Sequence, residues 1–479
     1  MQHEHTQQPL MSEQKKHWLI SIRDAFLARE GIAAYTPITI LVFIMFCAAS
    51  WEVFLPITDP ARYQCYALTF WLGSSATYLL PAQQCAFLHI TVPQAAFHML
   101  PLEYPPLTLL PFSLALLAPI QYYQLAFALL MALVVVCTHW LLLRYGPRGA
   151  GLIFTLYLLG GAVATAQVRF DLIPAALTLL CLIAAERRAW TAAYIALAFG
   201  VLFKLYPILL FPALFIAEQQ TEGRLIIPSK THGLPEMLKQ LLHALLGFHH
   251  WRWRNMLLFF ALCIGITVLF GLLNYQEAIA SQIDYFLHRP IQAESTSSTL
   301  LWLTAHLGVP YTIVYTYGSL NILNPFEHSV SIVGTCCFAL GCISVLYVQW
   351  RGRMDITQTS IALLLVFIST GKVFSPQYVI WLIPLLAYAG AFDFFWVCIW
   401  GPAAVLTTVI FAYFYTRPVP TLDIPMTAGF FQVVGIRNML MLIVTLAYLF
   451  NWFQVRHRRS LPPVETGKET RPLASQEGS

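Results

Sequence analysis

The sequence has little charge. Only 10% of its 479 residues are Asp, Glu, Lys or Arg, whereas 58% are apolar and the mean hydropathy is +0.67. An average soluble domain has roughly 25% charged residues. A chain with so few charges cannot cover a water-facing surface, so the composition argues against a soluble fold.

Several familiar motifs are also absent. There is no GxxxxGK[ST] loop for nucleotide phosphates and no HExxH motif for zinc, and the 14 histidines show no ligand spacing. Residues 1–34 are polar and the first apolar stretch is long enough to stay in the bilayer, so we expect an internal anchor rather than a cleaved signal peptide. Cys65 and Cys85 share one expected loop, where a disulfide and two free thiols are both compatible with the sequence.

The apolar residues occur in long continuous runs. Several runs are close to the roughly 20 residues that a helix needs to cross a bilayer, and they lack the alternation of a membrane β-barrel. We predict an all-α polytopic membrane protein with about twelve transmembrane helices. The expected spans are 36–55, 120–143, 150–168, 172–186, 189–204, 206–217, 256–273, 330–350, 356–372, 376–392, 394–414 and 432–453.

The basic residues indicate an orientation. With both termini inside, 20 of the 27 Lys and Arg residues fall on inner segments, as the positive-inside rule requires. Residues 105–119 and 299–307 are interrupted or short, so we expect them to lie at the outer interface. If either segment crossed the membrane, the basic pairs that follow it among Arg144/Arg148 and Arg351/Arg353 would face outward. Seven cations remain near the outer face: Arg62, Arg169, Lys204, Arg289, Lys372, Arg417 and Arg437.

This arrangement divides the chain into three parts. Residues 1–35 form a cytoplasmic segment, 36–455 a transmembrane domain, and 456–479 a tail rich in Pro, Glu, Ser and Gly that we expect to be disordered. The transmembrane domain includes outer loops at about 56–119 and 274–329 and an inner loop at about 218–255. The long first outer loop is large enough for small helices and a binding surface.

Ionisable groups close to the membrane indicate a functional site by default. Asp59, just after the first span, could take a proton from a sugar hydroxyl, or it could simply form an Asp-Pro turn. Glu103 could orient a substrate or be an ordinary loop residue. Arg169 and Asp171 lie at an outer turn, where they could form a pair or make two separate substrate contacts.

Three cations are suited to a lipid phosphate. Lys204 and Lys372 end inward-to-outward spans and each precedes an aromatic residue and a proline, although long side chains also reach the interface without a ligand. Arg289 has a planar guanidinium that suits bidentate phosphate binding, but it could be an exposed loop residue. Carboxylates that activate an acceptor and cations that stabilise a departing phosphate are the electrostatic requirements of glycosyl transfer.

At these residues the sequence resembles a known family. The Asp after the first span and the segments EYPPL, RFDLIP, FKLYPILLFP, RPIQAES and KVFSPQYVIWLIP occur in the order seen in the GT-C superfamily of polytopic glycosyltransferases. The resemblance is closest to glycosyltransferase family 87, the polyprenol-phosphate-mannose-dependent α-mannosyltransferases and their arabinofuranosyltransferase relatives. It extends from about residue 36 to 455.

The resemblance implies an inverting transfer of a sugar, mannose or another hexose or pentose, from a polyprenyl-phosphate donor to a lipid or glycan acceptor at the outer face of the cell membrane. It implies no nucleotide and no other cofactor, and Asp59 is the expected general base. The residues between Asp59 and Tyr104 do not match the acceptor-binding pattern, and Ala293 stands where a larger aliphatic residue is expected. The expected phosphate ligands are Lys204, Arg289 and Lys372, and the expected substrate contacts are Glu103, Tyr104, Arg169, Asp171, His288, Glu294, Gln377 and Tyr378.

Three other classes fit a polytopic chain with charges near the membrane. A transporter or flippase of a lipid-linked saccharide would place coupling charges near mid-membrane, often in two related halves, and neither feature is evident. A lipid-linked oligosaccharide ligase would have its large outer loop late in the chain. A protein without catalytic activity would tolerate loss of Asp59.

The expected orientation can be tested by cysteine labelling in intact cells. Because the loops after residues 143 and 350 should face the cytoplasm, Arg144→Cys and Arg351→Cys should add no labelling by a membrane-impermeant maleimide. Arg417→Cys, on the expected outer face, should add labelling. Efficient outside labelling at position 144 or 351 would contradict the orientation.

Overall fold

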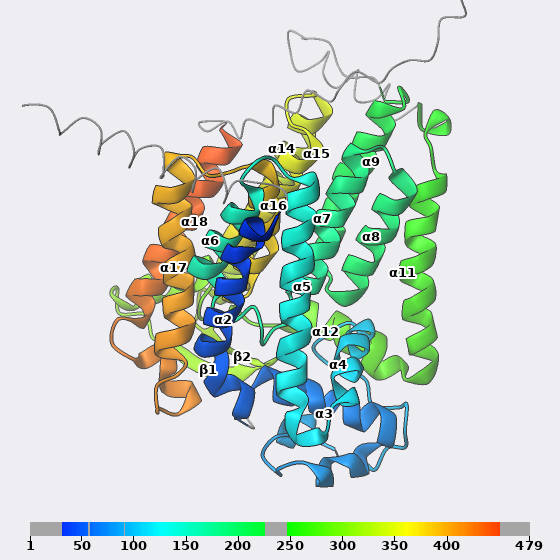
Figure 1. Ribbon diagram of the computed structural model, residues 1–479. Helices are drawn as coiled ribbons and strands as arrows, with labels where there is room; N and C mark the ends of the chain where they lie inside the picture. Colours follow the sequence, from blue (N-terminus) through cyan, green and yellow to red (C-terminus); the bar gives the residue numbers. More distant parts are fainter. Residues whose placement is uncertain (1–30, 56–57, 91, 226–246, 451–479) are drawn as a thin grey trace, which may run out of the picture.

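The computed structural model describes residues 31–55, 58–90, 92–225 and 247–450. Helices dominate this part of the chain, and their apolar surfaces confirm the predicted all-α membrane fold (Figure 1). The expected tail, most of the N-terminal segment and residues 226–246 of the expected inner loop lie outside the described residues.

Within the described residues, six helical segments are long and apolar enough to cross a membrane. Five are continuous α-helices, and the sixth, Trp396–Phe414, contains α17 (Gly401–Val409) between two π-helical turns. The other five are α2 (Ile32–Phe54), α5 (Tyr123–Tyr145), α11 (Arg254–Leu273), α14 (Glu327–Trp350) and α18 (Phe430–Leu449).

The remaining predicted spans coincide with shorter apolar helices. The span expected at 150–168 ends at Ala162, and the one expected at 206–217 begins as a 3-10 turn, Tyr206–Leu210, before α9. These shorter helices are α6 (Ala150–Ala162), α7 (Leu172–Glu186), α8 (Trp190–Phe203), α9 (Phe211–Thr221), α15 (Ile356–Thr370) and α16 (Tyr378–Ala389).

Short helices form the centre of the bundle. Every residue of α16 is buried, and most of α15 and α7 are buried with it. Gly161 permits close packing here, because a Cβ at that position would lie 2.9 Å from Val379 Cγ1. In contrast, α11 and α14 expose apolar side chains such as Leu257, Ile264 and Ile343, as expected for helices that face lipid.

Small helices fill the first long loop, as predicted. The segment 105–119 has no regular helix longer than six residues, and α13 (Thr296–Ala305) has ten. At 1.5 Å per residue neither could cross about 30 Å of hydrocarbon. The elements of the first loop are α3 (Asp59–Leu72), the 3-10 turns Ser74–Leu79, Ala86–Leu88, Pro106–Thr108, Ala115–Leu117 and Ile120–Tyr122, and α4 (Leu109–Leu114).

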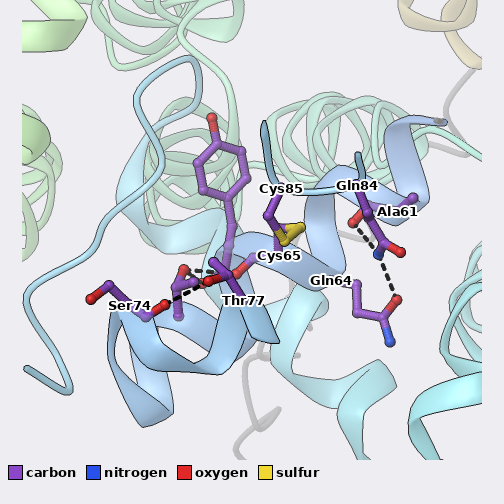
Figure 2. The surroundings of a disulfide bond; sticks show 9 residues. Ala61, Gln64, Cys65, Ser74, Thr77, Gln84 and Cys85 are labelled. Atoms are coloured by element: carbon purple, nitrogen blue, oxygen red, sulfur yellow. Dashed lines mark hydrogen bonds between the residues drawn. A yellow bond between two sulfur atoms is a disulfide. The ribbon is translucent and has the colours of Figure 1, made fainter. Parts of the chain in front are cut away.

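A disulfide joins Cys65 of α3 to Cys85, which settles the pairing that the sequence left open (Figure 2). Their Cα atoms are 5.7 Å apart. Beside the bond, Gln84 donates from Nε2 to the carbonyl of Ala61 at 2.9 Å and to Oε1 of Gln64 at 2.9 Å. These contacts attach the N-terminal half of α3 to the following loop and thereby position Asp59.

The second long loop contains an element that the sequence did not predict. After a π-helical turn, Gln276–Ala280, and α12 (Ser281–His288), strands β1 (Thr312–Thr316) and β2 (Ser319–Leu323) form an antiparallel hairpin. In β1 the segment TIVYT is rich in β-branched residues, which favour strands. The hairpin, α3, α4 and α12 lie at one end of the bundle, and the α14–α15 connection lies at the other (Figure 1).

Candidate active site

A cavity of about 850 Å³ lies at the bundle end that contains the hairpin and α3. Nine of the twelve predicted site residues line this cavity, although they come from segments far apart in the sequence. Asp171, His288 and Lys372 do not line it. The nine are Asp59, Glu103, Tyr104, Arg169, Lys204, Arg289, Glu294, Gln377 and Tyr378.

Asp59 is the first residue of α3 and does not terminate the preceding helix, which ends at Phe54. Thr58 caps α3 by accepting a hydrogen bond from the Ala61 amide at 3.4 Å, and the positive end of the helix favours an acidic residue here. The Asp59 carboxylate forms an ion pair with Arg169, and its side chain is only 14% exposed. It is a largely buried carboxylate directed into the cavity.

Arg62 lies between two carboxylates. Its Nη2 is 2.7 Å from Glu103 Oε1, and its Nη1 is 3.8 Å from Asp59 Oδ1. The guanidinium also lies 4.5 Å from the ring centroid of Phe87. We predicted Arg62 only as an outer cation and gave it no place in the site. Its spacing of i, i+3 from Asp59 on a helix was the available signal.

Asp171 pairs with Lys204 rather than with Arg169. Lys204 follows the end of α8, and its Nζ is 2.5 Å from Asp171 Oδ1. Trp381 donates from Nε1 to the same oxygen at 2.7 Å, and Asp171 is only 1% exposed. Asp171 therefore sits behind the cavity wall as the counter-ion of Lys204, whose charge is compensated.

Arg289 is a cation of a different kind. It follows α12, donates from Nη1 to the hydroxyl of Tyr285, and lies 4.8 Å from the centroid of that ring. Its buried Nε has no hydrogen-bond partner, and no carboxylate of the described chain lies within ion-pair distance of it. Arg289 can therefore still bind an anion.

The structure places two other predicted residues away from the cavity. His288 is 68% exposed and bonds to Asp284 through Nδ1 at 2.8 Å, because the end of α12 directs it outward. Lys372 lies between α15 and α16, where its carbonyl accepts a hydrogen bond from the Gln292 amide at 3.0 Å. Of the three predicted phosphate ligands, Arg289 is the one that lines the cavity without a carboxylate partner among the described residues.

Glu294 is buried in the cavity wall. Its Oε1 accepts a hydrogen bond from the Tyr415 hydroxyl, and its Oε2 has no partner among the described residues. Burial raises the pKa of Glu294 above its ordinary value, and Arg437 and Tyr415 oppose that rise only in part. Gln292 Oε1 is also buried without a partner in the described chain. Unsatisfied buried acceptors are costly, so both oxygens are suited to a ligand that supplies hydroxyl donors.

Another part of the cavity wall is apolar. It is formed by Leu205, Ile208, Leu209, Phe338 and Phe367. The cavity therefore combines charged and apolar walls, which suits a ligand with a polar head and a hydrocarbon chain. Within the described residues, no group of three or more His, Cys, Asp and Glu side chains could hold a metal ion.

Sequence reasoning missed several aromatic and amide residues of the lining. Tyr285 is four residues before Arg289 on α12 and Trp381 is three after Tyr378 on α16, and helical spacing could have identified both. Gln292 lies inside the RPIQAES segment already recognised. Tyr415 and the hairpin residue Tyr315 had no comparable signal, because long-range packing brings them to the cavity.

Comparisons with known proteins do not assign a family. No protein-family model matches the sequence, and no curated protein matches it. Among solved structures, the chain is similar to the crystal structure of ArnT from Cupriavidus metallidurans in the apo state, with 15% identity over 86% of this chain and 77% of that chain. The TM-score of 0.39 is too low to establish a common fold.

The Lys204–Asp171 pair gives a prediction about stability. Asp171→Asn should lower the melting temperature of the detergent-purified protein, because it leaves a buried ammonium without its counter-ion, at a cost of about 3–5 kcal/mol. Adding Lys204→Met should recover much of the loss, because it removes the stranded charge. A double variant no more stable than Asp171→Asn would show that the loss of stability does not come from the unpaired charge of Lys204.

Proposed function

We propose that this chain is a membrane glycosyltransferase of the GT-C type that transfers a sugar from a polyprenyl-phosphate donor to a lipid or glycan acceptor. The observation that carries the proposal is the cavity in which a paired carboxylate, Asp59, shares a wall with an uncompensated cation, Arg289. Mannose is the donor sugar favoured by the sequence resemblance. We further propose that the cavity faces the outer side of the cell membrane.

The cations that line the cavity suit a donor with one negative charge. Asp59 pairs with Arg169, Glu103 with Arg62, and Asp171 with Lys204. Among the cations that line the cavity, Arg289 remains without a carboxylate partner in the described chain, and burial raises the pKa of the other lining carboxyl, Glu294, which favours its neutral form. The phosphodiester of a polyprenyl-phosphate sugar carries one negative charge, whereas a diphosphate link carries two. Leaving a second charge without a cation would be costly in this partly buried site.

In the proposed reaction, Asp59 removes the proton from an acceptor hydroxyl as its oxygen attacks the anomeric carbon of the donor sugar. One carbon–oxygen bond forms to the acceptor, and the carbon–oxygen bond to phosphate breaks. The electron pair leaves with the polyprenyl phosphate, whose charge Arg289 stabilises. A single displacement inverts the anomeric configuration. Because polyprenyl phosphate is a weak base, it needs no acid to leave.

The remaining lining residues fit the other parts of such substrates. The apolar wall at Leu205, Ile208 and Phe338 can contact the hydrocarbon chain, and the unsatisfied oxygens of Gln292 and Glu294 can accept hydrogen bonds from sugar hydroxyls. Arg169 holds Asp59 and thereby orients the proposed base. Gln377 and Tyr378 line the same cavity and remain proposed substrate contacts.

A transporter or flippase of a lipid-linked saccharide is the alternative. It would also require a cavity open to an amphipathic ligand. The position of the cavity at one end of the bundle, with Asp59 and Glu103 held in ion pairs, favours chemistry at one face over passage across the bilayer.

The role of Asp59 predicts a specific loss of activity. Membrane vesicles given a radiolabelled polyprenyl-phosphate sugar and a lipid extract should form a labelled product, and Asp59→Asn should reduce its rate by at least about a hundredfold. The change keeps the size of the side chain and removes its basicity.

Asp423→Asn is the matched control, because Asp423 is exposed and does not line the cavity. This variant should keep the wild-type rate. A rate of product formation by Asp59→Asn close to that of the wild type, at an equal protein level, would exclude Asp59 as the base. Donor movement across wild-type vesicles without product would favour the flippase.

A further inference from the structure

The tip of the β1–β2 hairpin is a tight two-residue turn. Thr316 pairs with Ser319, so Tyr317 and Gly318 form the turn, and both have positive φ angles of 52° and 66°. Such a turn follows the natural twist of a hairpin, but it favours glycine because side chains are strained in this conformation. Both turn residues line the cavity.

Contacts on two sides hold the hairpin in place. Tyr317 donates from its hydroxyl to Asp284 Oδ2 at 3.1 Å, and its ring meets Tyr285 edge-on at 5.7 Å between centroids. On the other side, β2 is hydrogen-bonded to the segment before α13. The Ala293 amide donates to the Leu320 carbonyl at 2.9 Å, and the Ile322 amide donates to the Ile291 carbonyl at 2.8 Å. The tip is therefore fixed against α12.

Gly318 abuts the carboxylate of Glu103. A Cβ added to Gly318 would lie 2.5 Å from Glu103 Oε1, 2.9 Å from its Cδ and 3.0 Å from Oε2. Glu103 cannot turn away without cost, because its Oε1 is bound to Arg62 at 2.7 Å. The Glu103 carboxylate is thus held between the hairpin tip and the guanidinium of Arg62.

These contacts continue to the proposed base. Arg62 also approaches Asp59, with Nη1 3.8 Å from Oδ1. We propose that Gly318 is a positioning residue. Because it has no side chain, the hairpin tip can hold Glu103 in place, and Glu103 in turn holds Arg62 next to Asp59. This inference rests on the proposed transferase function, and it assigns the hairpin a part in aligning the acceptor side of the site.

The first test is Gly318→Ala, measured by transferase kinetics. The added Cβ should displace the Glu103 carboxylate and shift Arg62, so kcat should fall by about tenfold or more, since small misplacements near reacting groups are costly. The donor KM should change less than about threefold, because the three atoms nearest the added Cβ all belong to Glu103 and none to Arg289 or its partner Tyr285.

The matched control is Gly308→Ala. Gly308 also has a positive φ, of 84°, but a Cβ there would meet nothing within 4 Å. It therefore introduces similar backbone strain in the same loop without the collision. Its kcat should stay close to that of the wild type, and an equal loss in both variants would attribute the effect to backbone strain.

Rescue by a second substitution separates positioning from general damage. Glu103→Asp shortens the side chain by one methylene and makes room for the new Cβ. The double variant Gly318→Ala with Glu103→Asp should therefore be more active than Gly318→Ala alone. A double variant less active than both single variants would overturn the proposal.

A second readout does not depend on activity. Arg62 can be probed with phenylglyoxal, an arginine-selective reagent, followed by peptide mass spectrometry. Modification of Arg62 should be slow in the wild type and in Gly308→Ala, faster in Gly318→Ala, and slow again in the double variant. Unchanged reactivity would refute the contact chain. The expected reactivity pattern in a protein without transferase activity would refute the proposed function alone.

Discussion

The ion pair between Asp59 and Arg169 is the constraint on which the site depends. A carboxylate that is only 14% exposed at the end of a membrane bundle is costly unless a cation compensates it. The same requirement explains the pairing of Glu103 with Arg62 and of Asp171 with Lys204. Once these pairs are formed, Arg289 is distinguished among the cations that line the cavity by the absence of such a partner in the described chain.

The fold makes this pairing feasible by ending its central helices early. α6 ends at Ala162, α8 at Phe203 and α15 at Thr370. The segments that follow these helices lie at the end of the bundle that contains the cavity. There Arg169, Lys204 and Gln377 can approach residues of the two long loops. The Cys65–Cys85 disulfide holds α3 in place at the site, and the β1–β2 hairpin forms another part of the cavity wall.

Much of the fold could be read from the sequence because continuous apolar runs directly reflect the burial of helices in lipid or in a helical core. Every predicted span coincides with helical structure, although several central helices are shorter than a membrane crossing requires. The hairpin was missed, because ten residues of strand in a loop give little periodic signal. The cysteine pairing was left open, because spacing alone does not determine connectivity.

Site residues could be predicted where an ionisable residue lies close to an apolar span, as at Asp59, Lys204 and Arg289. Their partners were not predictable. Arg169 and Asp171 are two residues apart, yet they bond to different groups, because the turn between α6 and α7 directs their side chains to different neighbours. Lys372 and His288 satisfied the same sequence criteria as the lining residues, but neither lines the cavity, and the His288 side chain is 68% exposed. Direction at a helix break is set by tertiary packing, which the sequence pattern does not encode.

The central claim is that Arg289 binds the single charge of a monophosphate-linked donor. Binding of a polyprenyl-phosphate sugar and of the matching polyprenyl-diphosphate sugar can be compared by native mass spectrometry for the wild type and Arg289→Gln. We expect the wild type to prefer the monophosphate-linked donor and Arg289→Gln to weaken its binding by about tenfold or more, since hydrogen bonds to charged groups are worth about 1.5–3 kcal/mol. Equal binding of both donors, or unchanged binding by the variant, would contradict the account.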